Sequence, residues 1–599
     1  MRRYVTLWIS LMRLSWRRHP ALTGLALGSL LLDLATFAAV GLTLRAAVDS
    51  ASSGAATAAV AGAAGLAVCY GITTLLGIVT HNVRAQVAER VSLLELDPEF
   101  VRLVNRIETI EHLERTDFLD RITVLRNGSG GIVDSAWGAV ETVLGVCRLM
   151  VTLLLLGTVD PWLLMLLVFA VAPLWFDQRS SGPTSRAETA AAESVRLQRH
   201  LFTLATTASA GKEIRIAGAG AELIRRQRAA WDDAARVRFR AQCVAAAWRA
   251  CGWIVYTAGF VAGLLLVVRR TAAGQGTPGD IALAITVAAS LRIAVQQTLN
   301  RATGVVAYRR LLDPYLWLRD YAAEHTPAGE GAPAPDRLAD GIVLDRLTFT
   351  YPGTDRPALR DVSVRIPAGT LVAVVGEYGS GKSTLVKLLC KFYQPDSGAI
   401  RVDGVDLRHI GTASWRRRIS AAFQDFGRYE TTLRDVVGLG DPHRLDDTEA
   451  IGRAVTDADL DAVVAGLPDG LDTPVGEQFG GVNLSEGQWQ KTALARACLR
   501  DGPVLFVLDE PTASLDAPSE HAIFQRYMTR ARQLAASTGA VTVIVSHRFS
   551  TVSGADMIMV LRDGALVEWG SHDSLLGADG LYANLYGIQA TAYDASPRG

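Results

Sequence analysis

Apolar residues form long runs in the first half of the chain and short runs in the second half. A helix needs about 20 mostly apolar residues to cross a bilayer. The pattern predicts six such spans, the fourth of them short and the sixth weakened by Arg292 and two glutamines. The predicted spans are Ala21–Leu44, Ala55–Thr80, Val133–Gly157, Trp162–Trp175, Ala245–Val268 and Ile281–Leu299.

Positive charge next to the spans predicts their orientation, because Lys and Arg favour the cytoplasmic side. Five arginines precede the first span, and two long polar stretches rich in Arg follow the second and fourth spans. Arg269 and Arg270 fall on the opposite side and are outnumbered. We therefore expect the N-terminus, both long stretches and everything after the sixth span to be cytoplasmic.

Charged residues inside predicted spans are costly to bury, which makes them functional candidates. Asp33 lies midway along the first span and Arg292 lies in the sixth, and these two are candidates for lining a substrate cavity. Glu141 and Arg148 are two turns apart in the third span. The alternative is that these charges pair with one another, or that the helices extend beyond the bilayer.

A stretch rich in Pro, Gly and Ala, Thr326–Asp336, marks a domain boundary. Beyond it, short β-branched runs alternate with helical stretches, as in α/β folds. The predicted fold is a polytopic α-helical membrane domain (1–325), a linker (326–338) and an α/β P-loop NTPase domain (339–599).

A phosphate-binding loop is the clearest motif of the second half. The apolar run Leu371–Val375 predicts a buried strand, and G-x-x-x-x-G-K-S follows it before a helical stretch. Lys382 is expected to reach the β- and γ-phosphates of ATP, and Ser383 to bind Mg²⁺. The residues expected at the nucleotide are Gly376, Glu377, Tyr378, Gly379, Ser380, Gly381, Lys382, Ser383 and Thr384.

Two further apolar runs end in polar residues that suit ATP hydrolysis. Val504–Leu508 leads into Asp509 and Glu510, and Val541–Val545 leads to His547. Asp509 suits a Mg²⁺ site, Glu510 can polarise the attacking water, and His547 can contact the γ-phosphate. The sequence therefore predicts an ATPase that uses ATP and Mg²⁺.

The segment Leu484–Gln488, LSEGQ, resembles the LSGGQ signature of ATP-binding-cassette (ABC) proteins. Tyr351 resembles the aromatic residue that stacks on adenine, and Gln424 the glutamine that senses Mg²⁺ and the membrane domain. Thr473–Glu477 resembles the cross-talk segment of exporters. Six spans followed by this domain resemble an exporter half-transporter. The resemblance adds further nucleotide contacts at Ser485, Gly487, Gln488 and Asp516.

The resemblance also implies partners and a location. It implies a multi-pass protein of the bacterial cytoplasmic membrane that pairs with a second half-transporter, with coupling helices near Thr116–Asp120 and Ala217–Ala221. A homodimer is the default because all motifs are on one chain, and a heterodimer is the alternative. The formal net charge of zero gives no basis for nucleic-acid binding.

Glu486 departs from the signature, since it replaces the middle glycine. A carboxylate in the first turn of a helix suits the helix dipole but repels ATP if it faces the phosphates. We expect Glu486 to point away from the nucleotide.

Three further segments, Phe423–Phe426 with Tyr429, Gly487–Lys491 and Lys212–Arg215, resemble exporters of lantibiotics and related antibiotics. This implies export of a peptide or small natural product. The alternatives are a lipid flippase, one half of a heterodimeric drug exporter, and an importer with exporter layout. A non-transporting regulator is disfavoured because Glu510 and His547 are both present.

Overall fold

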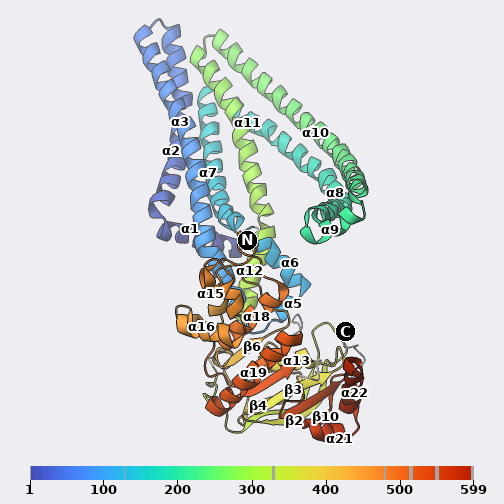
Figure 1. The fold of residues 1–599 in the computed structure, drawn as a ribbon. Coiled ribbons are helices and arrows are strands. Elements are labelled where there is room, and N and C mark those ends of the chain that lie inside the picture. The colour runs from blue at the N-terminus through green and yellow to red at the C-terminus, as the bar shows by residue number, and fades with distance from the viewer. Residues whose placement is uncertain are drawn as a thin grey trace. The chain divides into compact units, whose positions relative to one another are not determined.

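The computed structural model describes residues 2–126, 128–326, 329, 331–477, 480–511, 517–546 and 552–594. It divides into two compact units (Figure 1). The first consists of Met1–Leu103 and Arg121–Arg319, and the second of Val104–Asp120 and Asp320–Gly599.

The first unit is built from helices, six of which are long and apolar enough to cross a membrane among the described residues. This confirms the six predicted spans. In chain order the helices are α1 (Arg2–Arg18), α2 (Pro20–Ser52), α3 (Ala56–Val91), the π-helical η1 (Ser92–Leu96), α4 (Asp97–Arg106), α6 (Thr116–Arg126), α7 (Ser129–Val159), the 3-10 turn η2 (Pro161–Met165), α8 (Leu166–Thr206), α9 (Ala208–Ile216), α10 (Gly220–Ala272), α11 (Pro278–Ala307) and α12 (Arg309–Glu324). Of these, α4, α6 and α12 belong partly to the second unit.

The spanning helices are longer than the apolar runs that predicted them. The fourth run, short in the sequence, lies in a helical stretch that extends from Pro161 to Thr206. Hydropathy marks only the part of a helix that suits the bilayer core, and the polar remainder of α8 continues in the same helix. Pro173 and Pro183 lie inside α8.

Helices α8 and α10 lie side by side (Figure 1), and glycines of α10 allow their close approach. A Cβ added at Gly259 would lie 2.3 Å from Cγ of Phe169, and one at Gly252 would lie 2.8 Å from Cα of Pro173. Small residues at such contacts let helix backbones approach closely within a membrane.

The second unit holds two sheets in its described part. One has the strand order β2-β1-β4-β5, and the other, mostly parallel, has the order β10-β9-β3-β8-β7-β6. The strands are β1 (Gly341–Phe349), β2 (Leu359–Pro367), β3 (Leu371–Gly376), β4 (Ser397–Val402), β5 (Val405–Asp406), β6 (Ile419–Ala422), β7 (Leu505–Asp509), β8 (Val541–Val545), β9 (Met557–Arg562) and β10 (Ala565–Gly570).

Strands β3, β7 and β8 are buried along their apolar runs, as in a parallel sheet covered on both faces. Val372 and Val374 of β3 pack into one hydrophobic core, while Ala373 and Val375 pack into another. The helices of this unit are α5 (Glu111–Glu114), α13 (Lys382–Leu389), α14 (Thr412–Arg417), α15 (Leu433–Gly438), α16 (Thr448–Asp457), α17 (Asp461–Ala465), α18 (Glu486–Cys498), α19 (Ala517–Thr538), α21 (His572–Gly577) and α22 (Leu581–Asp594), with 3-10 turns η3 (Pro442–Arg444) and η4 (Gly470–Asp472).

Residues 104–120 lie far from the α/β domain in sequence but belong to the same unit. The amide of Ile110 donates to the carbonyl of Phe392 at 3.2 Å, and Thr412 donates to the Glu108 carboxylate at 2.6 Å. Helix α5 lies just before the predicted coupling segment at 116–120, which is the start of α6. The other predicted coupling segment, 217–221, begins immediately after α9.

Candidate nucleotide-binding site

The loop between β3 and α13 has the conformation of a phosphate cradle. Gly376, Gly379 and Gly381 have φ values of +150°, +77° and +102°. A Cβ on Gly376 would lie 2.1 Å from the carbonyl oxygen of Leu561, so the close approach requires glycine. The loop ends at the N-terminus of α13, where free amides and the helix dipole favour an anion.

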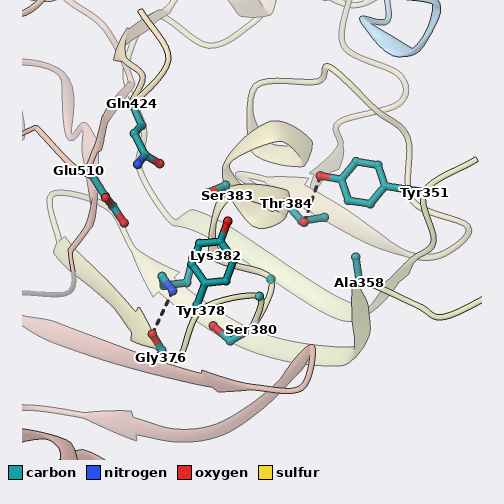
Figure 2. A pocket seen from close by; sticks show the side chains of 12 residues that line it. Tyr351, Ala358, Gly376, Tyr378, Ser380, Lys382, Ser383, Thr384, Gln424 and Glu510 are labelled. Atoms are coloured by element: carbon teal, nitrogen blue, oxygen red, sulfur yellow. Dashed lines mark hydrogen bonds between the residues drawn. The ribbon is translucent and has the colours of Figure 1, made fainter. Parts of the chain in front are cut away.

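Lys382 folds back over this loop (Figure 2). Its Nζ donates to the carbonyl oxygens of Gly376 and Glu377, both at 2.9 Å. Burial lowers the pKa of Lys382, although the carboxylates of Glu510 and Asp509 oppose that change. The ammonium group is thus already held at the mouth of the loop, with two acids near it.

Asp509 ends β7 and is buried, with only 6% of its surface exposed. Burial and the neighbouring Glu510 charge raise the pKa of Asp509 to about 6, against a hydrogen bond from Ser383 that lowers it. Its Oδ1 has no hydrogen-bond partner within the described residues. A buried carboxylate oxygen beside a serine hydroxyl fits a Mg²⁺ site, because Mg²⁺ takes oxygen ligands.

Glu510 follows Asp509 with a φ of +50°, a value that residues other than glycine seldom adopt. Its amide donates to the carbonyl of Val545 at 3.0 Å, and its carbonyl accepts from Nε2 of Gln490 at 3.2 Å. This backbone turn directs the Glu510 side chain toward the cavity (Figure 2). The sequence indicated Glu510 but gave no signal that Gln490 of α18 holds its backbone.

The loop, Gln424 and Glu510 surround one cavity of about 670 Å³. Its lining residues are Tyr351, Ala358, Gly376, Tyr378, Gly379, Ser380, Gly381, Lys382, Ser383, Thr384, Gln424 and Glu510. Tyr351 lies at one side with its hydroxyl 3.1 Å from that of Thr384, and Gln424 and Glu510 lie at the other (Figure 2). Most residues that the sequence placed at the nucleotide therefore lie together, and Glu377 joins them through its carbonyl bond to Lys382.

The signature segment lies outside this lining, at the start of α18. Ser485 caps the helix in a reciprocal arrangement with Gln488. The Gln488 amide donates to the serine hydroxyl at 3.3 Å, and the Ser485 amide donates to the Gln488 side chain at 2.8 Å. Ser485, Gly487 and Gln488 thus form a capped helix N-terminus that does not contribute to this chain's own cavity.

Glu486 forms an ion pair with Arg428, which lies in the loop after β6. Both side chains are about half exposed. Arg428 follows four residues after Gln424, so the pair links the loop that carries Gln424 to the first turn of α18. Nothing in the local sequence around either residue indicated this pairing.

Three charges of the predicted spans, Asp33, Glu141 and Arg148, are paired with residues of other helices. Asp33 of α2 lies 3.3 Å from Arg148 of α7, whose guanidinium also lies 4.1 Å from the ring centroid of Phe37. Glu141 of α7 lies 2.8 Å from Arg84 of α3. The contact of Asp33 with Arg148 is the kind of pairing that the sequence left open, whereas Glu141 is paired with Arg84, which lies outside the predicted spans.

Three of the predicted site residues have side chains that cannot be placed. His547 and Asp516 lie outside the described residues. Arg292 lies in α11, and its side chain is outside the described part. Their roles stay predictions.

Comparisons with known proteins show what this chain is similar to. Residues 359–513 match the family model described as ABC transporter. Over 306 residues the chain is 37% identical to proteins named ATP-dependent lipid A-core flippase, from Escherichia coli K12 and Shigella flexneri. The match covers 51% of this chain and 51% of each relative, so the chain spans about half the length of the curated relatives it matches.

A solved structure described as a bacterial Atm1-family ABC exporter with ATP bound has the same fold, with a TM-score of 0.72 and 24% identity. The alignment covers 94% of this chain and 98% of that one. The fold is thus the one of that solved structure. Among the described residues it has six helices long and apolar enough to cross a membrane, and it has an α/β domain in which residues 359–513 match the ABC transporter model. This confirms the predicted fold class. The antibiotic-exporter resemblance stays a prediction.

Proposed function

We propose that this chain is one half of a dimeric exporter that uses ATP hydrolysis to move its cargo across the cytoplasmic membrane. The observation that carries this proposal is the single cavity shared by the phosphate loop, Gln424 and Glu510, with the buried carboxylate of Asp509 beside Ser383.

In this proposal the loop amides and Lys382 bind the phosphates of ATP, and Tyr351 offers its ring to the base. Ser383, Asp509 and Gln424 would hold Mg²⁺, which would supply charge neutralisation at the phosphates. Glu510 accepts a hydrogen bond from a water that attacks the γ-phosphorus. The bond from that phosphorus to the bridging oxygen then breaks. ADP keeps the electron pair of that bond, and the phosphate leaves with both protons of the water. His547, which lies outside the described residues, is proposed to contact the γ-phosphate.

The signature segment gives the reason for a dimer. Its capped helix N-terminus is an anion site, yet it lies outside the cavity of its own chain. A second half-transporter would bring Ser485, Gly487, Gln488 and Asp516 against the ATP of the first. A homodimer meets this need with two identical sites, and a heterodimer with a similar chain meets it equally.

For the cargo, the first proposal is a peptide or small natural product, moved outward from a cytoplasmic ATPase side. It rests on the resemblance of Phe423–Phe426 and Gly487–Lys491 to antibiotic exporters. A lipid is the second candidate, because the curated relatives at 37% identity are named lipid A-core flippases. Asp33 and Arg292 are proposed to line the cargo path, and a cargo that binds Asp33 has to compete with Arg148.

The test is a transport assay with the full chain in proteoliposomes that have the ATPase side outward. Two cargoes are followed in parallel: accumulation of a labelled cationic peptide library, and bleaching of fluorescent phospholipid by an external reductant. ATP-dependent peptide accumulation, absent in Glu510→Gln, supports the first proposal. ATP-dependent lipid flipping without peptide accumulation overturns the peptide proposal in favour of the lipid.

A further inference from the structure

Tyr351, Lys387 and Tyr393 form a cluster at one end of the nucleotide cavity. Nζ of Lys387 lies 5.5 Å from the ring centroid of Tyr351 and 5.9 Å from that of Tyr393. The two tyrosine rings meet edge to face with centroids 5.5 Å apart. A cation within about 6 Å of a ring centroid is attracted to the ring. The orientation of Tyr351 is therefore tied to Lys387 and Tyr393.

Both carboxylate oxygens of Glu114 bind this cluster. Oε1 accepts from Nζ of Lys387 at 2.7 Å, and Oε2 accepts from the hydroxyl of Tyr393. Burial acts to raise the pKa of Glu114, but the hydrogen bonds from Lys387 and Tyr393 outweigh it and hold that pKa below its ordinary value. Glu114 is thus a charged carboxylate at neutral pH, held by two charge-assisted hydrogen bonds.

Along the chain, Glu114 lies between two of the helical stretches that are long and apolar enough to cross a membrane. It ends α5 in segment 104–120, which follows the spanning stretch Ala56–Arg106 and leads through α6 toward α7. The bonds of Ile110 to Phe392 and of Glu108 to Thr412 lie earlier in the same segment. Of these contacts, those of Glu114 reach the side chains around the ring that lines the nucleotide cavity.

We propose that Glu114 is a positioning residue through which occupancy of the base end of the cavity, at Tyr351, acts on segment 104–120. This rests on the proposed function, since it requires ATP in the cavity. A base stacked on Tyr351 restricts that ring and, through Lys387 and Tyr393, fixes Glu114. The phosphates contact the loop instead, which Tyr351 reaches through its hydroxyl, 3.1 Å from that of Thr384, and not through Lys387 or Glu114.

Linkage makes the proposal testable without hydrolysis, because coupling between two sites is reciprocal. If base binding stabilises the Glu114 contacts, loss of those contacts weakens a ligand that has a base. It leaves unchanged a ligand that has only phosphates. Magnesium tripolyphosphate is such a ligand, and Mg-ATP is its counterpart with a base.

The experiment uses the full chain in lipid nanodiscs with Glu510→Gln to prevent hydrolysis. Binding of Mg-ATP and of Mg-tripolyphosphate is measured with and without Glu114→Gln. Tryptic cleavage after the exposed Arg106 reports on segment 104–120. We expect Glu114→Gln to weaken ATP binding about fivefold or more and to leave tripolyphosphate binding unchanged. We also expect ATP, but not tripolyphosphate, to slow the cleavage, and this protection to be lost in Glu114→Gln.

Glu111→Gln is the matched control. Glu111 lies on the same short helix and is paired with Arg115 at 3.8 Å; its charge acts on Tyr393, but among the described residues it makes no hydrogen bond to Lys387 or Tyr393. It should leave both affinities and the cleavage unchanged, while Tyr393→Phe should reproduce part of the Glu114→Gln effect. Equal weakening of both ligands, or an equal effect of Glu111→Gln, overturns the inference. A parent protein that binds neither ligand contradicts the proposed function itself.

Discussion

Arg428 and Glu486 form an ion pair that joins the loop after β6 to the first turn of α18. The acid that replaces the signature glycine is therefore neutralised within its own domain. The pair is half exposed, and pairs of that kind contribute little to folding stability. The effect of the pair is electrostatic, because Arg428 offsets the negative charge of Glu486 at the N-terminus of α18.

The pair predicts how ATP hydrolysis responds to substitution. Glu486→Gly should leave turnover within about twofold of the parent, because the charge it removes is already compensated. Arg428→Ala should lower ATP affinity by about two- to fivefold, because it leaves the carboxylate unpaired near the helix N-terminus. Steady-state hydrolysis in nanodiscs measures both.

The double variant Arg428→Ala/Glu486→Gly serves as the control for that effect. It should recover the parent affinity, since no unpaired charge remains. A several-fold rise in turnover in Glu486→Gly alone would show that this carboxylate impairs the site despite Arg428.

Asp509 predicts a pH dependence of magnesium binding. Its raised pKa of about 6 means that it is protonated below that pH and must lose the proton to bind Mg²⁺. Mg-ATP affinity should therefore fall as the pH drops below about 6, by about tenfold per pH unit for this one proton. Calorimetric titration of the Glu510→Gln protein with Mg-ATP, in steps of about half a pH unit from about pH 5 to about pH 8, measures how the affinity depends on pH.

The γ-phosphate of ATP takes up a proton in a similar range, so Asp509→Asn is the reference. That variant retains the proton uptake by ATP and lacks the one by Asp509. If the Mg-ATP affinities of the parent and of Asp509→Asn depend on pH with the same slope below about pH 6, the raised pKa of Asp509 is contradicted.

The pair of Asp33 and Arg148 predicts non-additive effects on stability. Asp33→Asn leaves a partly buried guanidinium without its carboxylate and should cost about 2 kcal/mol, seen as a lower Tm in nanodiscs. Asp33→Asn/Arg148→Gln removes both charges and should be more stable than Asp33→Asn alone. Glu222→Gln, in the exposed pair with Arg225, is the control and should leave Tm unchanged. Additive losses in the double variant would show that the two residues act independently.

The sequence predicted those features that depend on local pattern. Runs of about 20 apolar residues indicate bilayer spans directly, and a buried strand followed by G-x-x-x-x-G-K-S indicates the loop between β3 and α13. Both required only neighbouring residues. The described part of the structure has six helices long and apolar enough to cross a membrane, and it has this strand, loop and helix.

Contacts between distant segments could not be predicted in the same way. Glu114 and Lys387 are 273 positions apart, and nothing near either residue specifies the other. The same holds for the hydrogen bond from Gln490 to the carbonyl of Glu510 and for the ion pair of Arg428 with Glu486. The charges in the spans were recognised as unusual, but their partners depend on which helix faces which.

The measurement that tests the central claim most directly is ATP hydrolysis by this chain alone, purified into lipid nanodiscs, beside the Glu510→Gln variant. The account predicts Mg²⁺-dependent hydrolysis that Glu510→Gln abolishes while ATP stays bound. Hydrolysis that persists undiminished in Glu510→Gln would contradict the role of Glu510, and a chain that binds no ATP would contradict the nucleotide site itself.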